Sequence, residues 1–212
     1  MVIEHAGKIK YECVSLQDLA VDGILSIAEE KEVDLIIMGT KGAKGLTEII
    51  MGSNTASVIE KAKCPVIAIP KGVRFKQIKK ITYASDYHKS DIGALKKLLE
   101  IAKPFNAQIN ILHVSSIELE KEKDLMKKFM AEVNDKIDYF NLSFQILGGD
   151  DVEKELENYL QEDNCDLLVM ATHHRDLMDR IFGKSFTKKM AFHTKIPLMA
   201  FHYKKAESVM IL

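Results

Sequence analysis

The chain has 212 residues, which suits one or two domains at the usual size of about 100–200 residues each. Its 30 Lys and Arg residues are balanced by 31 Asp and Glu residues, and this argues against a general nucleic-acid binder, because such proteins usually carry a strong basic excess. Hydrophobic residues make up 47% of the chain, so a packed core is expected. No apolar run has the length of roughly 18 residues that a membrane span needs, and we expect no membrane partner.

The first third of the chain contains three predicted elements. A continuous apolar run predicts a buried strand over 33–38. A helix is expected over 54–62, with Ser53 near its N-cap, followed by a strand over 66–69. Glycines 39, 42 and 52 lie between the first strand and the helix.

The rest of the chain predicts strands that alternate with amphipathic helices. Strands are expected over 79–84, 107–114, 142–147, 166–171 and 198–202, and helices over 90–103, 117–137, from about 152 to Asp163, and 185–193. This alternation is typical of an α/β domain with a parallel sheet.

Two parts of the chain resemble each other at a fixed separation of 132 positions. Asp34–Thr40 reads DLIIMGT, and Asp166–Thr172 reads DLLVMAT. Further identical pairs follow at the same offset without a gap: Ile49 and Ile181, Ser53 and Ser185, Thr55 and Thr187, Lys63 and Lys195, Pro65 and Pro197, Ala68 and Ala200. We therefore expect two copies of one domain-sized unit, over residues 1–72 and 73–212.

The first copy begins late. Met1 aligns with residue 133, in the middle of the second helix of the second copy, so the first two strands and the first helix have no counterpart. Either the sequence is a fragment of a longer protein, or another chain supplies the missing strands. We favour the fragment, because a natural half-domain would leave sheet edges unpaired.

The glycine-rich loop is the main candidate site. It follows the carboxyl end of a parallel strand, which is where open α/β sheets bind ligands. Glycines let the backbone approach a phosphate closely, and the N–H groups at a helix start can then donate to it. On spacing alone, the same glycines could equally serve only to make tight turns.

The spacing Gly39-x2-Gly42-x9-Gly52-Ser53 resembles the nucleotide-binding branch of the universal stress protein (UspA-like) family. Ile81–Asp86 resembles the family's first strand, which ends in an Asp, and Ile109–Val114 resembles its second. The resemblance implies a Rossmann-like, open, five-stranded parallel sheet with strand order 3-2-1-4-5, present in tandem. It also implies that the strand numbered 3 in the first copy lies around residues 8–14.

The resemblance implies that the first copy binds ATP, with or without Mg, or another adenine nucleotide, through Gly39, Gly42, Gly52, Ser53 and Asn54. The family holds adenosine with residues of its first two strands, and the first copy lacks these strands. We therefore expect this chain to carry a phosphate loop without its adenosine pocket.

The second copy departs from the family pattern. Ala171, His174 and Lys184 stand opposite the three glycines, and their side chains should hinder a close backbone approach. Asp86, Val114 and Ser185 remain as candidate contacts for a nucleotide in this half. A domain that stabilises or regulates the first copy is the alternative role.

Other motifs in the sequence do not meet the requirements of a known site. Gly183-Lys184-Ser185 lacks the earlier glycine of a P-loop, since Met178 occupies that position. The histidines at 173, 174, 193 and 202 lack the spacing of a zinc site, and no catalytic set is evident. Cys13, Cys64 and Cys165 are too far apart for a disulfide framework or a zinc knuckle. We expect reduced thiols in a cytoplasmic protein.

Three functions follow from these observations. The first is a cytoplasmic stress-response regulator that binds an adenine nucleotide. The second is a scaffold that binds no nucleotide, and the third is a slow ATP hydrolase. In the family, the last strands of neighbouring domains often pair, so we expect 66–69 to pair with 198–202 in an internal pseudo-dimer. A homodimer is also compatible with the sequence.

Overall fold

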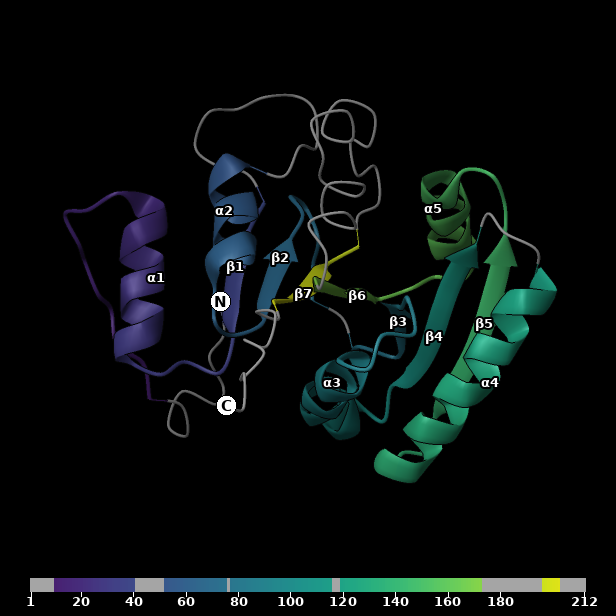
Figure 1. The fold of residues 1–212 in the computed structure, drawn as a ribbon. Coiled ribbons are helices and arrows are strands. Elements are labelled where there is room, and N and C mark those ends of the chain that lie inside the picture. The colour runs from purple at the N-terminus through teal and green to yellow at the C-terminus, as the bar shows by residue number, and fades with distance from the viewer. Residues whose placement is uncertain (1–9, 41–51, 76, 116–118, 173–195, 203–212) are drawn as a thin grey trace, which may run out of the picture.

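The computed structural model describes residues 10–40, 52–75, 77–115, 119–172 and 196–202. Within these ranges the chain forms one seven-stranded sheet with helices on both faces (Figure 1). The strands are β1 (Ile36–Gly39), β2 (Val66–Ile69), β3 (Lys80–Ala84), β4 (Gln108–Ser115), β5 (Leu142–Gly148), β6 (Leu167–Thr172) and β7 (Leu198–His202). The helices are α1 (Ala20–Glu30), α2 (Ser53–Lys61), α3 (Asp91–Phe105), α4 (Leu119–Lys136) and α5 (Val152–Glu162).

The sheet order is β1-β2-β7-β6-β3-β4-β5. The second half alone has the order β5-β4-β3-β6-β7 with all neighbours parallel, which is the predicted order 3-2-1-4-5. The α/β fold class is therefore confirmed. All neighbouring strands in the sheet are parallel except β2 and β7, which are antiparallel.

The pair β2 and β7 joins the two halves of the chain. Its register places Val66 opposite Ala200 and Ala68 opposite Leu198. The expected pairing of the two final strands is present. The two strand ranges were also predicted correctly to within one residue, because each is a short apolar run that follows a proline.

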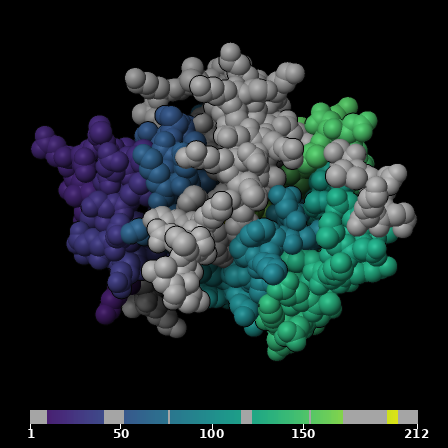
Figure 2. All heavy atoms as spheres, viewed as in Figure 1, coloured from purple at the N-terminus to yellow at the C-terminus, as the bar shows by residue number. Residues whose placement is uncertain are grey.

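Two layers of helices cover the sheet. The apolar faces of α3 and α4 pack on one face, in a core that includes Leu95, Leu98, Phe129 and Val133. Helix α5 packs on the other face with Leu156 and Leu160. Helices α1 and α2 lie on that same face, over β1 and β2, and Figure 2 shows that α1 lies at the end of the molecule opposite α4.

The 132-residue offset also relates elements of the structure. Helix α1 spans Ala20–Glu30 and α5 spans Val152–Glu162, so both ends differ by the same offset. Glu32 and its counterpart Asn164 both have positive φ, 47° and 53°, in the region that Asn tolerates better than most residues. The division into domains 1–72 and 73–212 stays a prediction that this coincidence supports.

One predicted strand is wrong over its described part. Residues 10–14 have no regular structure and are exposed, with Tyr11 84% exposed. In the resemblance this strand would pair with a strand that the first copy lacks. An isolated strand has no partner for its N–H and C=O groups, so the segment stays irregular.

Candidate functional site

The end of β1 and the start of α2 are held together by two hydrogen bonds. The backbone N–H of Gly52 donates to the carbonyl oxygen of Thr40 at 2.7 Å. The hydroxyl of Thr55 donates to the carbonyl oxygen of Gly39 at 3.1 Å, and Thr55 is buried. The carboxyl end of β1 and the N-terminus of α2 therefore lie next to each other in space, although residues 41–51 separate them in the sequence.

The N-terminus of α2 has no side-chain cap. Its N-cap residue is Gly52, and Ser53 is the first residue of the helix. Ser53 was expected near the N-cap, and it directly follows the N-cap residue, which is Gly52. Ser53 and Asn54 are exposed, and the first turn contains no acidic residue. The first N–H groups of a helix carry a partial positive charge and lack intrahelical partners, so this end can accept an anion.

Thr40 adds a buried hydroxyl beside this helix end. The residue is 7% exposed, and its Oγ1 has no hydrogen-bond partner among the described residues. A buried hydroxyl without a partner is costly. Such a group is suited to donate to a ligand oxygen.

Gly39 has open space around it. A Cβ placed on Gly39 would meet no heavy atom within 4 Å, so the fold itself does not require a glycine here. The missing side chain leaves the backbone at the strand end accessible. Gly42, the middle glycine of the loop, lies outside the described residues.

β1 is the outermost strand of the sheet, and no strand lies on its other side in the described ranges. The resemblance places the adenosine contacts on strands at that position. The absence of an adenosine pocket stays a prediction.

The candidate residues of the second half lie at the carboxyl ends of β3 and β4. The ladder pairs Ala84 with Leu112. Asp86 lies two positions beyond the end of β3, and Val114 lies two positions further along β4. Asp86 is exposed, whereas Val114 is half-buried and packs against the core under α5. Ala171, opposite Gly39 in the repeat, is buried. Ser185 lies outside the described residues.

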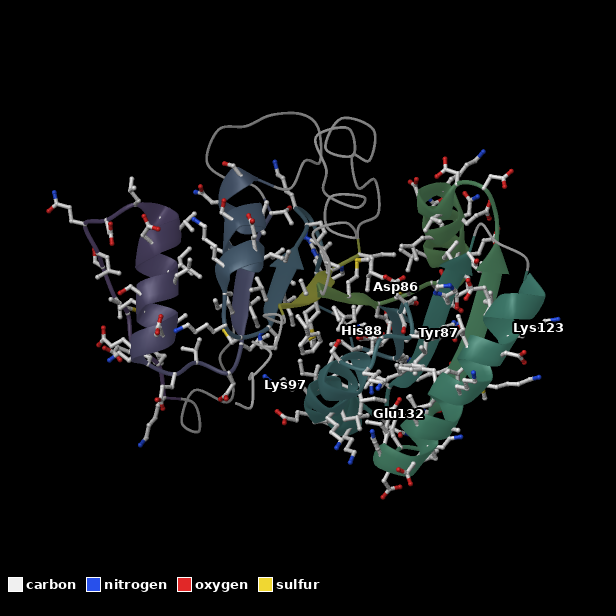
Figure 3. All side chains as sticks on the ribbon, viewed as in Figure 1. Asp86, Tyr87, His88, Lys97, Lys123 and Glu132 are labelled. Carbon is white, nitrogen blue, oxygen red and sulfur yellow. The ribbon has the colours of Figure 1, made fainter. Side chains whose placement is uncertain are left out.

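A polar cluster at the same ends of β3 and β4 was not predicted. The hydroxyl of Ser85 donates to the buried carboxylate of Asp91 at 2.6 Å. It also accepts the N–H of Tyr87 at 2.9 Å. These bonds hold the turn between β3 and α3, where Figure 3 shows Asp86, Tyr87 and His88. The sequence signal that could have revealed this cluster is the group of polar residues directly after the strand.

His113 lies at the centre of that cluster. Its Nδ1 is 2.7 Å from the carbonyl oxygen of Ser85, so Nδ1 must carry the proton and donate. Its Nε2 is 3.4 Å from Oε2 of Glu122 on α4. The ring of Tyr87 stacks on His113 at 4.6 Å between centroids, and burial raises the pKa of the Tyr87 hydroxyl. The members of this cluster contact one another, and together they connect α4 to the carboxyl ends of β3 and β4.

A pocket of about 270 Å³ lies beneath α5, near the amino ends of β3, β4 and β5. Asn110 donates to Gln145 at 3.2 Å and to the hydroxyl of Tyr159 at 2.5 Å. Lys80 pairs with Asp163 at 3.0 Å, which raises the pKa of the lysine. These bonds join the polar groups across the pocket.

The described residues contain no group of three His, Cys, Asp or Glu side chains arranged to hold a metal ion. They also contain no helix that is long and apolar enough to cross a membrane. The histidines 173, 174 and 193 that were weighed as metal ligands lie outside the described ranges.

The described residues form an open α/β sheet, and the glycine-rich segment of the sequence follows the carboxyl end of the parallel strand β1. The model of the universal stress protein family matches residues 2–70 and 77–202. The chain therefore belongs to the universal stress protein family.

Two curated relatives are universal stress proteins of Methanocaldococcus jannaschii. One is 40% identical over 63 residues, which cover 30% of this chain and 37% of the relative. The other is 41% identical over 69 residues, covering 32% of this chain and 42% of the relative. These matches span less than half the length of either relative.

Solved structures show the same fold. A universal stress protein of Archaeoglobus fulgidus superposes on 88% of this chain and 66% of its own, with a TM-score of 0.60 at 18% identity. A functionally unknown protein of Pseudomonas aeruginosa superposes on 88% of this chain and 69% of its own, with a TM-score of 0.61 at 16% identity. At these identities the likeness concerns the fold alone.

Proposed function

We propose that this protein is a cytoplasmic stress-response regulator whose glycine loop binds the phosphates of ATP or another adenine nucleotide, with or without Mg. Gly39, Gly42, Gly52, Ser53 and Asn54 supply the loop and the helix start. The observation that carries the proposal is the uncapped N-terminus of α2, held against the end of β1 by the bond from Gly52 to Thr40. A phosphate placed there receives N–H donors and the positive end of the helix dipole.

Gly52→Asp tests this proposal with a retained fold. Gly52 has φ −60° and ψ 148°, which any residue adopts. An Asp at this N-cap stabilises the helix by a few tenths of a kcal/mol relative to Gly. Its negative charge occupies the helix start and repels a phosphate. We expect the thermal stability to be kept or raised and ATP binding to fall by on the order of tenfold.

Gly52→Asn is the matched control, because it caps the helix without a charge. Native mass spectrometry with Mg-ATP reads the bound nucleotide directly, and calorimetry gives the affinity. If Gly52→Asp and the original chain bind ATP equally well, the site lies elsewhere.

A nucleotide-independent scaffold is the second candidate. It is favoured by the β2–β7 pair, which makes one sheet of both halves. A mass spectrum without any nucleotide adduct, together with an unchanged melting temperature in ATP, supports the scaffold over the regulator.

A further inference from the structure

The sheet face under α5 changes from apolar to polar along its strands. Toward the carboxyl ends of β3, β4 and β5 its residues are apolar and pack under α5: Ala84, Leu112, Val114 and Leu147. Alternate residues of a strand share one face, so the residues on this face nearer the amino ends are polar: Lys80, Thr82, Asn110, Ser143 and Gln145. This polar part of the face lines the pocket of about 270 Å³ beneath α5.

Asn110 lies at the centre of the polar part. It is 8% exposed, in the middle of a strand, where Asn is a disfavoured residue. Its Nδ2 donates to Oε1 of Gln145 at 3.2 Å and to the hydroxyl of Tyr159 at 2.5 Å. Its Oδ1 accepts the hydroxyl of Ser143 at 3.1 Å. One buried amide therefore fixes three polar side chains around the pocket.

These bonds leave hydrogen-bond donors over. Within the described residues, neither Nε2 of Gln145 nor the O–H of Tyr159 donates to a partner, since both side chains act as acceptors toward Asn110. Burial raises the pKa of the Tyr159 hydroxyl, so it keeps its proton at neutral pH and stays a donor. Gln108 also lines the pocket with an exposed amide. The acceptors for these donors have to come from water or from a ligand.

The two charges in the pocket cancel each other. Nζ of Lys80 donates to the backbone oxygen and to Oδ1 of Asp163, both at 3.0 Å. A charged ligand would have to compete with this pair. The groups that remain are neutral amides and hydroxyls, and a ligand hydroxyl matches them because it donates and accepts at one atom. The volume is close to the lower end of the range for ligand pockets, roughly 300–1,000 Å³.

We propose that this pocket binds one small neutral molecule with several hydroxyl groups, of the size of a monosaccharide, through Gln145, Tyr159 and Gln108. None of these residues belongs to the glycine loop, so the site is additional to the proposed nucleotide site.

NMR of the full chain tests the proposal through the side-chain amide signals of Gln145, Gln108 and Asn110. The probes are D-glucose, D-ribose and myo-inositol, each titrated separately, since molecules of this size bind with a Kd on the order of millimolar. At least one probe should shift these three amide signals along a saturating curve. If no probe does so, or if the saturating shifts lie outside the pocket, the proposal is overturned.

L-Glutamate tests the alternative of a charged ligand in the same pocket. It should leave the three amide signals in place, because the Lys80–Asp163 pair already neutralises the charges that it would need. Saturating shifts with L-glutamate and none with the neutral probes would contradict the proposal.

Tyr159→Phe keeps the ring and removes the hydroxyl, and it should weaken the binding of the best probe by on the order of tenfold. Tyr139→Phe is the matched control, because it removes a hydroxyl that donates to the carbonyl oxygen of Ala107 at 2.6 Å on the other face of the sheet. It should leave the affinity unchanged. Equal affinities of the two variants would show that the Tyr159 hydroxyl does not contact the probe and would refute the site.

Gln145→Leu gives a second test at a half-buried position of the outer strand β5. It removes the amide donors and should weaken probe binding by on the order of tenfold, whereas full affinity in this variant would refute the site. Gly52→Asp, which alters the glycine loop alone, should bind the probe as the original chain does. Loss of probe binding in Gly52→Asp would contradict a separate site, and loss of ATP binding alone concerns only the proposed function.

Discussion

Helix α1 with β1, and helix α5 with β6, are two versions of one unit in different surroundings. Both helices have 11 residues and both strands follow after a residue with positive φ. In the second version, β3 lies beside the strand, β4 lies under the helix, and the apolar side chains are buried. In the first version these neighbours are missing within the described residues, so Ile37 is exposed and Ile24 is only half-buried. The local sequence thus specifies the helix and the strand. The neighbouring strands determine how much apolar surface the two elements bury, and therefore how much they stabilise the fold.

The largest expected effect is the difference between Val169→Asp and Ile37→Asp. An unpaired carboxylate at the fully buried Val169 should cost several kcal/mol of the free energy of unfolding and prevent folding in many conditions. At Ile37, which is 64% exposed, the cost should stay within about 0.5–1 kcal/mol. Urea unfolding followed by circular dichroism measures both. Equal losses would mean that the β1 edge is covered in solution.

Shortening one apolar side chain on each helix should again lower the free energy of unfolding more in the second half than in the first. Leu156 on α5 is 8% exposed, and Leu156→Ala should cost about 2–4 kcal/mol. Its counterpart Ile24 is half-buried beside an open groove between α1 and the start of β1, so Ile24→Ala should cost about 1 kcal/mol. The pair is compared by urea midpoints at equal m-values. A larger loss at Ile24 would reverse the comparison between the two helices.

The two aspartates at the strand starts give a smaller difference. Asp166→Asn removes a charged acceptor for the N–H groups of Lys79 and Lys80 and should cost about 1–2 kcal/mol. Asp34→Asn should change the stability by less than about 0.5 kcal/mol. Thermal unfolding of both variants is the measurement, with faster amide exchange at Lys80 as the local sign. An unaltered exchange rate at Lys80 would show that Asp166 does not hold β3.

The smallest effect concerns the residues with positive φ. Glu32→Gly relieves a left-handed conformation that a Glu side chain disfavours, and it should stabilise the protein by about 0.5 kcal/mol. Asn164→Gly should be close to neutral, because Asn tolerates this conformation. Melting temperatures of the two variants decide the order. A destabilising Glu32→Gly would show that the entropy of the unfolded chain outweighs the strain at this position.

Periodicity and repeats predicted most of the fold. β7 was placed at the right residues, and the helix predicted over 90–103 is α3, which spans Asp91–Phe105 with Ser90 as its N-cap. The strand that the resemblance implied around residues 8–14 is not formed over the described residues 10–14. A β-rich pattern depends on a neighbouring strand for its hydrogen bonds, and a linear sequence does not state whether that neighbour is present.

The candidate site was predicted in part. The glycine spacing located the strand end and the helix start, and the structure joins them through Gly52 and Thr40. The hydroxyl of Thr40 carries no signal in the sequence, since a threonine after a strand is common. The cluster around His113 was missed because its members come from the turn after β3, from α3, β4 and α4, and meet only in the folded chain.

The short ladder between β2 and β7 has a consequence for how the two halves find each other. It consists of three register pairs, which would give little affinity between separate molecules. The segment from Pro70 to Lys79 connects β2 to β3. The short linker therefore brings β2 and β7 together at an effective concentration on the order of millimolar. Cleaving this linker would turn a first-order closure into a concentration-dependent association, without the loss of a single hydrogen bond of the ladder.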